Sequence, residues 1–389
     1  MDHQATTPVD QRVLEAMLPW FRTRVGNPHS VTHAYGRAAH DAVERAREQV
    51  AALINADREE VVFTSGATEA TNLAIRGLLC SGKAHAVTSS IEHSCVRETL
   101  ADLGRHGVTV TEVRVDREGL VDPTGVQAAL TKRTQLVSIM AVNNEVGTVQ
   151  PLYEIACLCA DAGVVLHSDA AQAVGKIPLD VKKLPIDMMS ISGHKIYGPQ
   201  GIGALYCTRD LFGRLRPVMT GGGQEGGLRP GTLPTALCVG LGMACEIARS
   251  EMDAEARRLT DMRSMFIHRI SAEVDGIRIN GSIESRVPGN LNLLIEGVDA
   301  EALLSRLPEI AMSTGSACSS SAIEPSHVLL AMGLTSEQAH SSVRIGLGRG
   351  TTQKELDEVI IRLRKEIRAV RTAGELHAIR QSGKRRAVR

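Results

Sequence analysis

A chain of 389 residues with 44 basic and 44 acidic side chains carries no net charge, so its overall field does not favour nucleic acids or membranes as partners. Hydrophobic residues make up 43% of the chain and charged residues 23%, which is typical of globular proteins. No run approaches the roughly 20 apolar residues of a membrane span, and the N-terminus lacks the pattern of a signal peptide, so we expect a cytoplasmic protein.

Eight cysteines are scattered without the spacing of a disulfide framework or a zinc site. Cys157 and Cys159 lie in a helical pattern, where residues two apart point to different faces. We therefore expect reduced thiols and no metal site.

The first predicted element is a helix over residues 37–54, which has a 3.6-residue apolar period. Helical stretches then separate most of a series of short apolar strands, which are expected over residues 60–64, 85–88, 109–113, 136–140, 164–167, 188–191 and 204–207. This alternation is typical of an α/β fold with a doubly wound, mainly parallel sheet.

Beyond residue 233 the pattern changes to an α+β one. A long helical region over 234–273 precedes strands that are expected over 277–280, 290–295 and 343–347, a helix over 353–372 and a basic tail. We predict a large domain over residues 12–250 and a smaller domain formed by residues 1–11 and 251–389. The tail is most simply a frayed, solvated terminus, and direct nucleic-acid binding is not expected.

The most informative motif is Ser192-Gly193-His194-Lys195, which directly follows an apolar segment over 186–191 that we interpret as a buried strand. A lysine at a strand end is a candidate for imine chemistry, because partial desolvation lowers the pKa of the amine and makes the neutral nucleophile accessible. Taken alone, a lysine in such a motif is far more often a surface residue in a turn.

Other polar residues follow predicted strands. Ser65-Gly66-Ala67-Thr68 lies between a strand and a helix, where backbone N–H groups bind phosphate, although the same pattern also suits a simple helix cap. Asp169 follows another strand, where a carboxylate faces the ligand crevice and could keep a pyridine nitrogen protonated. Asn143-Asn144-Glu145 lies beyond a third strand, and residues 221–227 form a glycine-dense loop.

Two further residues are candidates for chemistry. Cys318 lies among small polar residues over 313–321, which indicates an exposed loop whose thiol is reactive if a base or cation stabilises the thiolate. His93 could act as an acid or base, stack on a ring, or be structural.

Together these motifs resemble the NifS/IscS class of pyridoxal-phosphate-dependent cysteine desulfurases, within the class-V aminotransferase family. Several motifs in the family's order are far more specific than any one of them. The resemblance extends from Ala5-Thr6-Thr7-Pro8 to about Arg371 and includes Gly26-Asn27-Pro28-His29-Ser30, Thr64-Ser65-Gly66-Ala67-Thr68-Glu69, Val142-Asn143-Asn144-Glu145, Ser192-Gly193-His194-Lys195 and Gly315-Ser316-Ala317-Cys318.

The resemblance implies a fold-type I, aspartate-aminotransferase-like homodimer with its active site near the subunit interface. It implies that Lys195 holds pyridoxal 5'-phosphate covalently and that Asp169 pairs with the pyridinium nitrogen. Gln172 would pair with the ring hydroxyl, and His93 would stack on the ring.

The resemblance also assigns the ends of the site. Asn144 would contact the cofactor and, with Arg344, bind the substrate carboxylate, since an arginine fork suits a carboxylate. The phosphate would be bound by Ala67, Thr68, Ser192, His194 and Thr232 of the partner subunit.

The implied activity is conversion of L-cysteine into L-alanine. Lys195 would move the α-proton of the substrate, and the Cys318 thiolate would attack the substrate sulfur to form a persulfide. The sulfur would then pass to an acceptor protein of iron–sulfur cluster assembly, tRNA thiolation or DNA phosphorothioation. The alternatives are a selenocysteine lyase on the same fold and a largely non-catalytic scaffold subunit.

Three features depart from the family's pattern. The chain begins at Met1-Asp2-His3, where the family has a few more strand residues. Gly226-Gly227 replaces the more usual Glu-Arg-Gly, so no basic residue is expected there. The tail over 375–389 does not resemble the extension by which iron–sulfur desulfurases bind their scaffold, which leaves the acceptor open.

Overall fold

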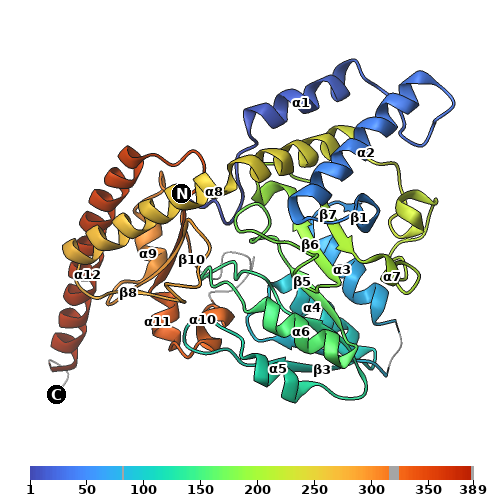
Figure 1. Cartoon of the computed structure of the whole chain (residues 1–389). Helices are drawn as coiled ribbons and strands as arrows, with labels where there is room; N and C mark the ends of the chain where they lie inside the picture. Colours follow the sequence, from blue (N-terminus) through green and yellow to red (C-terminus); the bar gives the residue numbers. More distant parts are fainter. Residues whose placement is uncertain (81–82, 315–323, 387–389) are drawn as a thin grey trace.

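The computed structural model describes residues 1–80, 83–314 and 324–386, with side chains up to residue 374. These residues form two sheets, and helices pack against both (Figure 1).

The larger sheet has seven strands in the order β1-β7-β6-β5-β4-β2-β3. In chain order they are β1 (Val61–Thr64), β2 (His85–Ser89), β3 (Thr109–Val113), β4 (Thr134–Ser138), β5 (Val165–Asp169), β6 (Met188–Ser192) and β7 (Gly203–Cys207). Neighbours are parallel except around β7, which runs antiparallel to both β1 and β6. The predicted mainly parallel sheet is therefore confirmed.

One predicted strand is displaced. The strand expected over 136–140 is β4, which spans Thr134–Ser138. Met140 lies outside it because its backbone N–H donates to the carboxylate of Glu92, at 3.0 Å, and not to a neighbouring strand.

Helices cover both faces of the larger sheet. Successive strand residues point to opposite faces, so each face carries its own cluster of buried apolar side chains. Val61 and Phe63 pack on the face that carries α1 (Gln11–Arg22), α2 (Ala34–Ile54), α5 (Pro123–Ala129), α6 (Leu152–Ala162) and the first half of α8 (Thr235–Glu273). Val62 packs on the opposite face, which carries α3 (Ala67–Leu78), α4 (Ser94–Arg105) and α7 (Arg209–Phe212).

Two helices differ from expectation. No helix was predicted before residue 37, and the structure adds α1, which contains Pro19. Helix α2 begins before the predicted residue 37, because the His33 ring accepts the N–H of Gly36 and caps the helix there.

The smaller sheet is antiparallel, with the order β10-β11-β9-β8. Its strands are β8 (Ile277–Ile279), β9 (Asn290–Ile295), β10 (Ser313–Thr314) and β11 (Ser342–Gly346). The chain's start joins it, because Asp2 forms a bridge with Gly346. Three short helices flank this region: α9 (Ala300–Ser305), α10 (His327–Ala331) and α11 (Ser336–His340).

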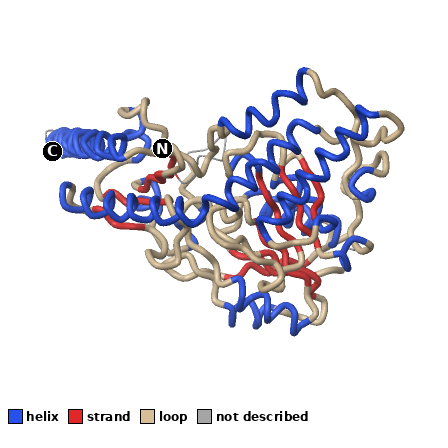
Figure 2. The backbone as a smooth tube through the Cα atoms, turned by 45° about the horizontal axis from the view of Figure 1, so that its top comes forward, coloured by secondary structure: helices blue, strands red, loops and turns tan. Residues whose placement is uncertain are grey.

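The second half of α8 and α12 (Gln353–Arg386) complete the core around the smaller sheet. Figure 2 shows α12, the long helix that ends at C, on the side away from the larger sheet. It continues past the predicted end at residue 372, because no proline interrupts the sequence up to Arg386. Helix α8 runs unbroken through residue 250, and the domain boundary placed there stays a prediction. Within the described residues, no helix is both long and apolar enough to cross a membrane.

Candidate active site

A cavity of about 500 Å³ lies at one edge of the larger sheet, where β1, β2, β4, β5 and β6 end. Open α/β sheets bind ligands at the carboxyl ends of their parallel strands, because the loops that diverge there leave a crevice. Ten residues selected from the sequence line this cavity: Ala67, Thr68, His93, Asn144, Asp169, Gln172, Ser192, His194, Lys195 and Arg344. The fold thus brings them together, while the role of each stays a prediction.

The N-terminus of α3 forms one end of the cavity. Gly66 precedes it with φ +157°, a conformation that side chains rarely adopt, and no side chain caps the helix. The backbone also needs space here, because a Cβ on Gly203 of β7 would lie 2.7 Å from the Gly66 Cα. Ala67 and Thr68 therefore present first-turn N–H groups to the cavity, close to Ser192 on its wall. This donor set suits an anion such as phosphate.

The glycine-rich loop is fastened beside α3 by two ion pairs. The side chain of Glu225 in the short η3 helix (Gln224–Gly227) is 2% exposed and pairs with Arg47 at 2.7 Å. Arg229 pairs with Glu69 at 2.9 Å. Burial opposes ionisation of Glu69, but Arg229 and the Ser65 donors outweigh it and lower the pKa of that carboxyl. Arg47 and Arg229 therefore supply the positive charges beside this loop, where Gly226-Gly227 replaces the family's more usual Glu-Arg-Gly.

Asp169, the last residue of β5, also lines the cavity. Its carboxylate accepts the N–H of Ala171 at 2.9 Å and the thiol of Cys95 at 3.6 Å. Burial and the Asp169 charge raise the pKa of Cys95, so this thiol stays protonated. Ligand atoms of His93, Cys95 and Asp169 lie within 4.8 Å of one another, but a protonated thiol that donates to the carboxylate does not form a metal site.

His93 is the N-cap residue of α4, directly before Ser94, and it lines the cavity. Its ring Nδ1 accepts the backbone N–H of Cys95 at 3.2 Å. Burial lowers the pKa of the ring, and Lys195 adds to this effect while Asp169 opposes it. His93 is therefore a neutral imidazole whose other nitrogen carries the proton, which suits ring stacking.

Lys195 ends the short helix η2 (Gly193–Lys195), directly after β6. Its Nζ donates to the carbonyl oxygens of Gln4, at 2.5 Å, and Ala5, at 2.8 Å. The neighbouring His194 contacts the Thr6 hydroxyl at 3.1 Å, and burial together with Lys195 lowers the pKa of this histidine to about 4. The start of the chain therefore lies directly against the lysine.

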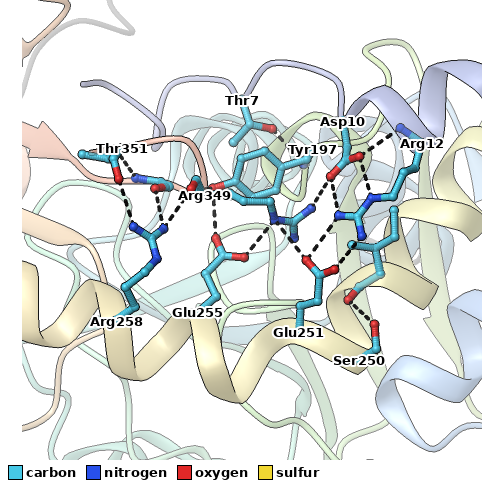
Figure 3. Close-up of polar contacts among 12 residues, drawn as sticks. Thr7, Asp10, Arg12, Tyr197, Ser250, Glu251, Glu255, Arg258, Arg349 and Thr351 are labelled. Carbon is cyan, nitrogen blue, oxygen red and sulfur yellow. Dashed lines mark hydrogen bonds and ion pairs between the residues drawn. The ribbon is translucent and has the colours of Figure 1, made fainter. Parts of the chain in front are cut away.

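Figure 3 shows how the segment after Lys195 is anchored. The Tyr197 hydroxyl accepts the N–H of Arg349, at 2.5 Å, and donates to Glu255 of α8, at 3.2 Å. The Arg349 guanidinium lies 4.2 Å from the centroid of the tyrosine ring and pairs with Asp10 at 2.7 Å. The lysine segment is thus connected to the N-terminal segment, to α8 and to the loop after β11.

Arg344 enters the cavity from β11 and is 3% exposed. It donates to the carbonyl oxygen of Asn144 at 3.0 Å and pairs with Asp2 at 2.9 Å. Its buried Nε has no hydrogen-bond partner within the described part of the chain. The Arg344 guanidinium therefore already binds the Asp2 carboxylate, and its Nε–H donor is available for a further acceptor.

Two predicted residues are not placed in the cavity. Cys318 lies outside the described residues, although β10, which precedes it, pairs Ser313 with Arg344 at the cavity wall. Thr232 is exposed and does not line the cavity of its own chain.

Among the lining residues that were not selected from the sequence, Gln4 and Cys95 make polar contacts with Lys195 and Asp169. Gln4 directly precedes the Ala5-Thr6-Thr7-Pro8 motif, and Cys95 lies two residues after His93. Their position next to these motifs was the only feature of the sequence that could have pointed to Gln4 and Cys95.

Comparison with known proteins agrees with this geometry. The model of the family described as Aminotransferase class-V matches residues 1–359. The chain is 48% identical over 363 residues to the cysteine desulfurase IscS of Rickettsia africae (strain ESF-5), which covers 92% of this chain and 88% of the relative. A solved NifS-like protein superposes with a TM-score of 0.87 at 35% identity, over 94% of this chain and 97% of that one. A structure of SspA in complex with cysteine superposes with a TM-score of 0.80 at 39% identity, over 89% and 97%.

Proposed function

The chain belongs to the class-V aminotransferase family, and we propose that within it this protein is a pyridoxal-phosphate-dependent cysteine desulfurase that converts L-cysteine into L-alanine. The observation that carries the proposal is the cavity in which a lysine, a carboxylate and a helix N-terminus converge. The comparisons do not favour a selenocysteine lyase or a non-catalytic scaffold.

The residues present fit the cofactor. Uncapped N–H groups of α3 suit the phosphate, and the strained Gly66 leaves space for it. The Asp169 carboxylate and the Lys195 amine face the same cavity. Pyridoxal phosphate, when bound, supplies an electron sink that weakens the bonds at the substrate α-carbon.

Each residue has a proposed role toward this group. Lys195 holds the cofactor covalently and moves the substrate α-proton at its Nζ. Asp169 keeps the ring nitrogen protonated, Gln172 donates to the ring hydroxyl and His93 stacks on the ring, while Asn144 makes a further contact. The phosphate is bound by Ala67, Thr68, Ser192, His194 and Thr232 of the partner subunit.

The substrate carboxylate is proposed to bind Arg344, next to Asn144. The ion pair with Asp2 supports this role, because it shows that the buried guanidinium accommodates a carboxylate. Substrate binding there exchanges Asp2 for the carboxylate of cysteine or uses the donor at Nε.

Cys318 is proposed to receive the sulfur. Its thiolate attacks the substrate sulfur, an S–S bond forms and the substrate C–S bond breaks. The electron pair of the broken bond stays on the substrate carbon, which takes a proton and leaves as alanine. The persulfide on Cys318 then passes to an acceptor protein of iron–sulfur assembly, tRNA thiolation or DNA phosphorothioation.

The test uses purified protein with added cofactor. We expect a visible absorption band that is lost in Lys195→Ala, and cysteine-dependent sulfide release that is lost in Cys318→Ala. A colourless wild-type protein, or a Cys318→Ala variant that releases sulfide at the wild-type rate, would contradict the proposal. Transfer of labelled sulfur from the persulfide to cellular proteins identifies the acceptor.

We also propose that the protein is a homodimer that shares its sites. Support comes from the exposed Thr232 and from large apolar side chains left exposed on and after α1, namely Phe21, Val25 and Tyr35, each at least 60% exposed. A mixture of Lys195→Ala and Thr232→Ala chains should regain activity, because one site of each mixed dimer has both residues. A monomer in sedimentation measurements would refute this arrangement.

A further inference from the structure

A second lysine lies beside the candidate active site and has no part in the chemistry above. Lys176 follows β5 in the chain and lines a small cavity of about 30 Å³. Gln4 and Lys195 line both this small cavity and the large one, so the two adjoin at these residues. Lys176 is therefore close enough to act on the cofactor site through its neighbours.

Lys176 contacts the site through the amide of Gln172. Its Nζ donates to Gln172 Oε1 at 2.6 Å, and Gln172 Nε2 donates to the carbonyl oxygen of Gln4 at 2.9 Å. The same carbonyl accepts the Nζ of Lys195. One carbonyl oxygen therefore connects Lys176 and Gln172 to the catalytic lysine.

These contacts fix which way the amide points. If the amide turned over, its oxygen would face the Gln4 carbonyl oxygen, so that hydrogen bond would be lost. Its NH₂ group would then face Lys176, whose ammonium form has no lone pair to accept a hydrogen bond. An amide has two N–H donors, and Gln4 takes one of them. The second remains for the large cavity, which Gln172 lines.

We propose that Lys176 is a positioning residue that holds the Gln172 amide as a hydrogen-bond donor toward the ring hydroxyl of the bound cofactor. This inference rests on the proposed function, because it assigns Lys176 a task toward the proposed role of Gln172. Burial and the charge of Lys195 lower the pKa of Lys176 to about 7, but the neutral amine still donates to Gln172.

The test compares Lys176→Met with the wild type by titrating apo-protein with pyridoxal phosphate. Loss of one oriented hydrogen bond should weaken cofactor binding about 3- to 10-fold and shift the visible absorption maximum. Lys183→Met is the matched control, because Lys183 lies in the same segment between β5 and β6 and its side chain is 85% exposed. It should leave both the affinity and the spectrum unchanged.

A double-variant cycle separates positioning from a general structural effect. If Lys176 acts through Gln172, then Lys176→Met combined with Gln172→Met should bind the cofactor as Gln172→Met alone does. Additive losses, or a Lys176→Met protein with the wild-type affinity and spectrum, would overturn the inference. Should Lys176→Met not fold, Lys176→Ala replaces it, because it removes the amine that donates to Gln172 and adds no other polar group. Wild-type behaviour of that variant would equally overturn the inference.

The same measurements distinguish failure of the proposed function from failure of the inference about Lys176. A wild-type protein without a visible band, or a Lys195→Ala variant that keeps the band, contradicts the proposed function itself. A normal band that depends on Lys195 but not on Lys176 contradicts this inference alone.

Discussion

The buried carboxyl of Glu92 gives a prediction about stability that can be tested without an activity assay. Glu92 directly precedes His93 and is 0% exposed. One carboxyl oxygen accepts the Ser89 hydroxyl at 2.5 Å and the Met140 N–H at 3.0 Å, while the other has no partner within the described residues. Burial is the main cause that raises the pKa of Glu92 from 4.5 to about 8, although both hydrogen bonds oppose it.

The direction of the effect follows from proton binding. Between about pH 4.5 and 8 the folded protein keeps this proton and the unfolded chain releases it, so the free energy of unfolding falls as the pH rises. At about 1.4 kcal/mol for each pKa unit, this difference amounts to an upper bound of about 5 kcal/mol. The contribution is fully present below pH 4.5 and is lost above pH 8.

Glu92→Gln should remove this pH dependence, because the amide is neutral at every pH and its oxygen still accepts from Ser89 and Met140. We expect similar unfolding temperatures for variant and wild type near pH 5, and a variant that is more stable by at least about 1 kcal/mol near pH 8.5. Thermal unfolding of the cofactor-loaded proteins measures this difference. Glu98→Gln on the exposed side of α4 is the control.

The reasoning would be refuted by a Glu92→Gln variant whose stability follows that of the wild type across this pH range. A loss of the same size at every pH would refute it as well, because it would report lost packing and not a retained proton.

Three further changes test the supports of the site. Arg349→Met removes one of the three arginines from the polar cluster of Figure 3, the one that pairs with Asp10 and Glu255. It should cost about 1–3 kcal/mol of stability in thermal unfolding, whereas an unchanged unfolding temperature would contradict this. Gly203→Ala should weaken cofactor binding measured by titration, since its Cβ would press on Gly66; normal affinity would show that the backbone yields. Arg47→Met leaves the buried carboxylate of Glu225 without its cation and should destabilise the protein by about 3–5 kcal/mol at neutral pH. An unchanged midpoint of chemical denaturation would disprove this.

The sequence by itself determined most of the strands and the mainly parallel sheet, and together with the family resemblance it identified ten of the residues that line the cavity. Buried parallel strands are recognisable as short apolar runs because both faces are covered by helices. Polar residues just after such runs, such as Asp169 and Lys195, converge because the carboxyl ends of parallel strands share one edge. Where a local signal misled, as at Met140, a hydrogen bond to the Glu92 side chain replaced the regular strand pattern.

Only the tertiary structure decided what surrounds these residues. The contacts of Gln4 with Lys195 and Gln172 join positions more than 160 residues apart in the chain, as do those of Arg344 with Asp2. No periodicity or spacing encodes such pairs, because hydrogen bonds between distant segments form only after the two sheets and the N-terminal segment have packed together. Lys176 therefore showed no signal in the sequence, and it became a candidate for a role only through the amide that it contacts.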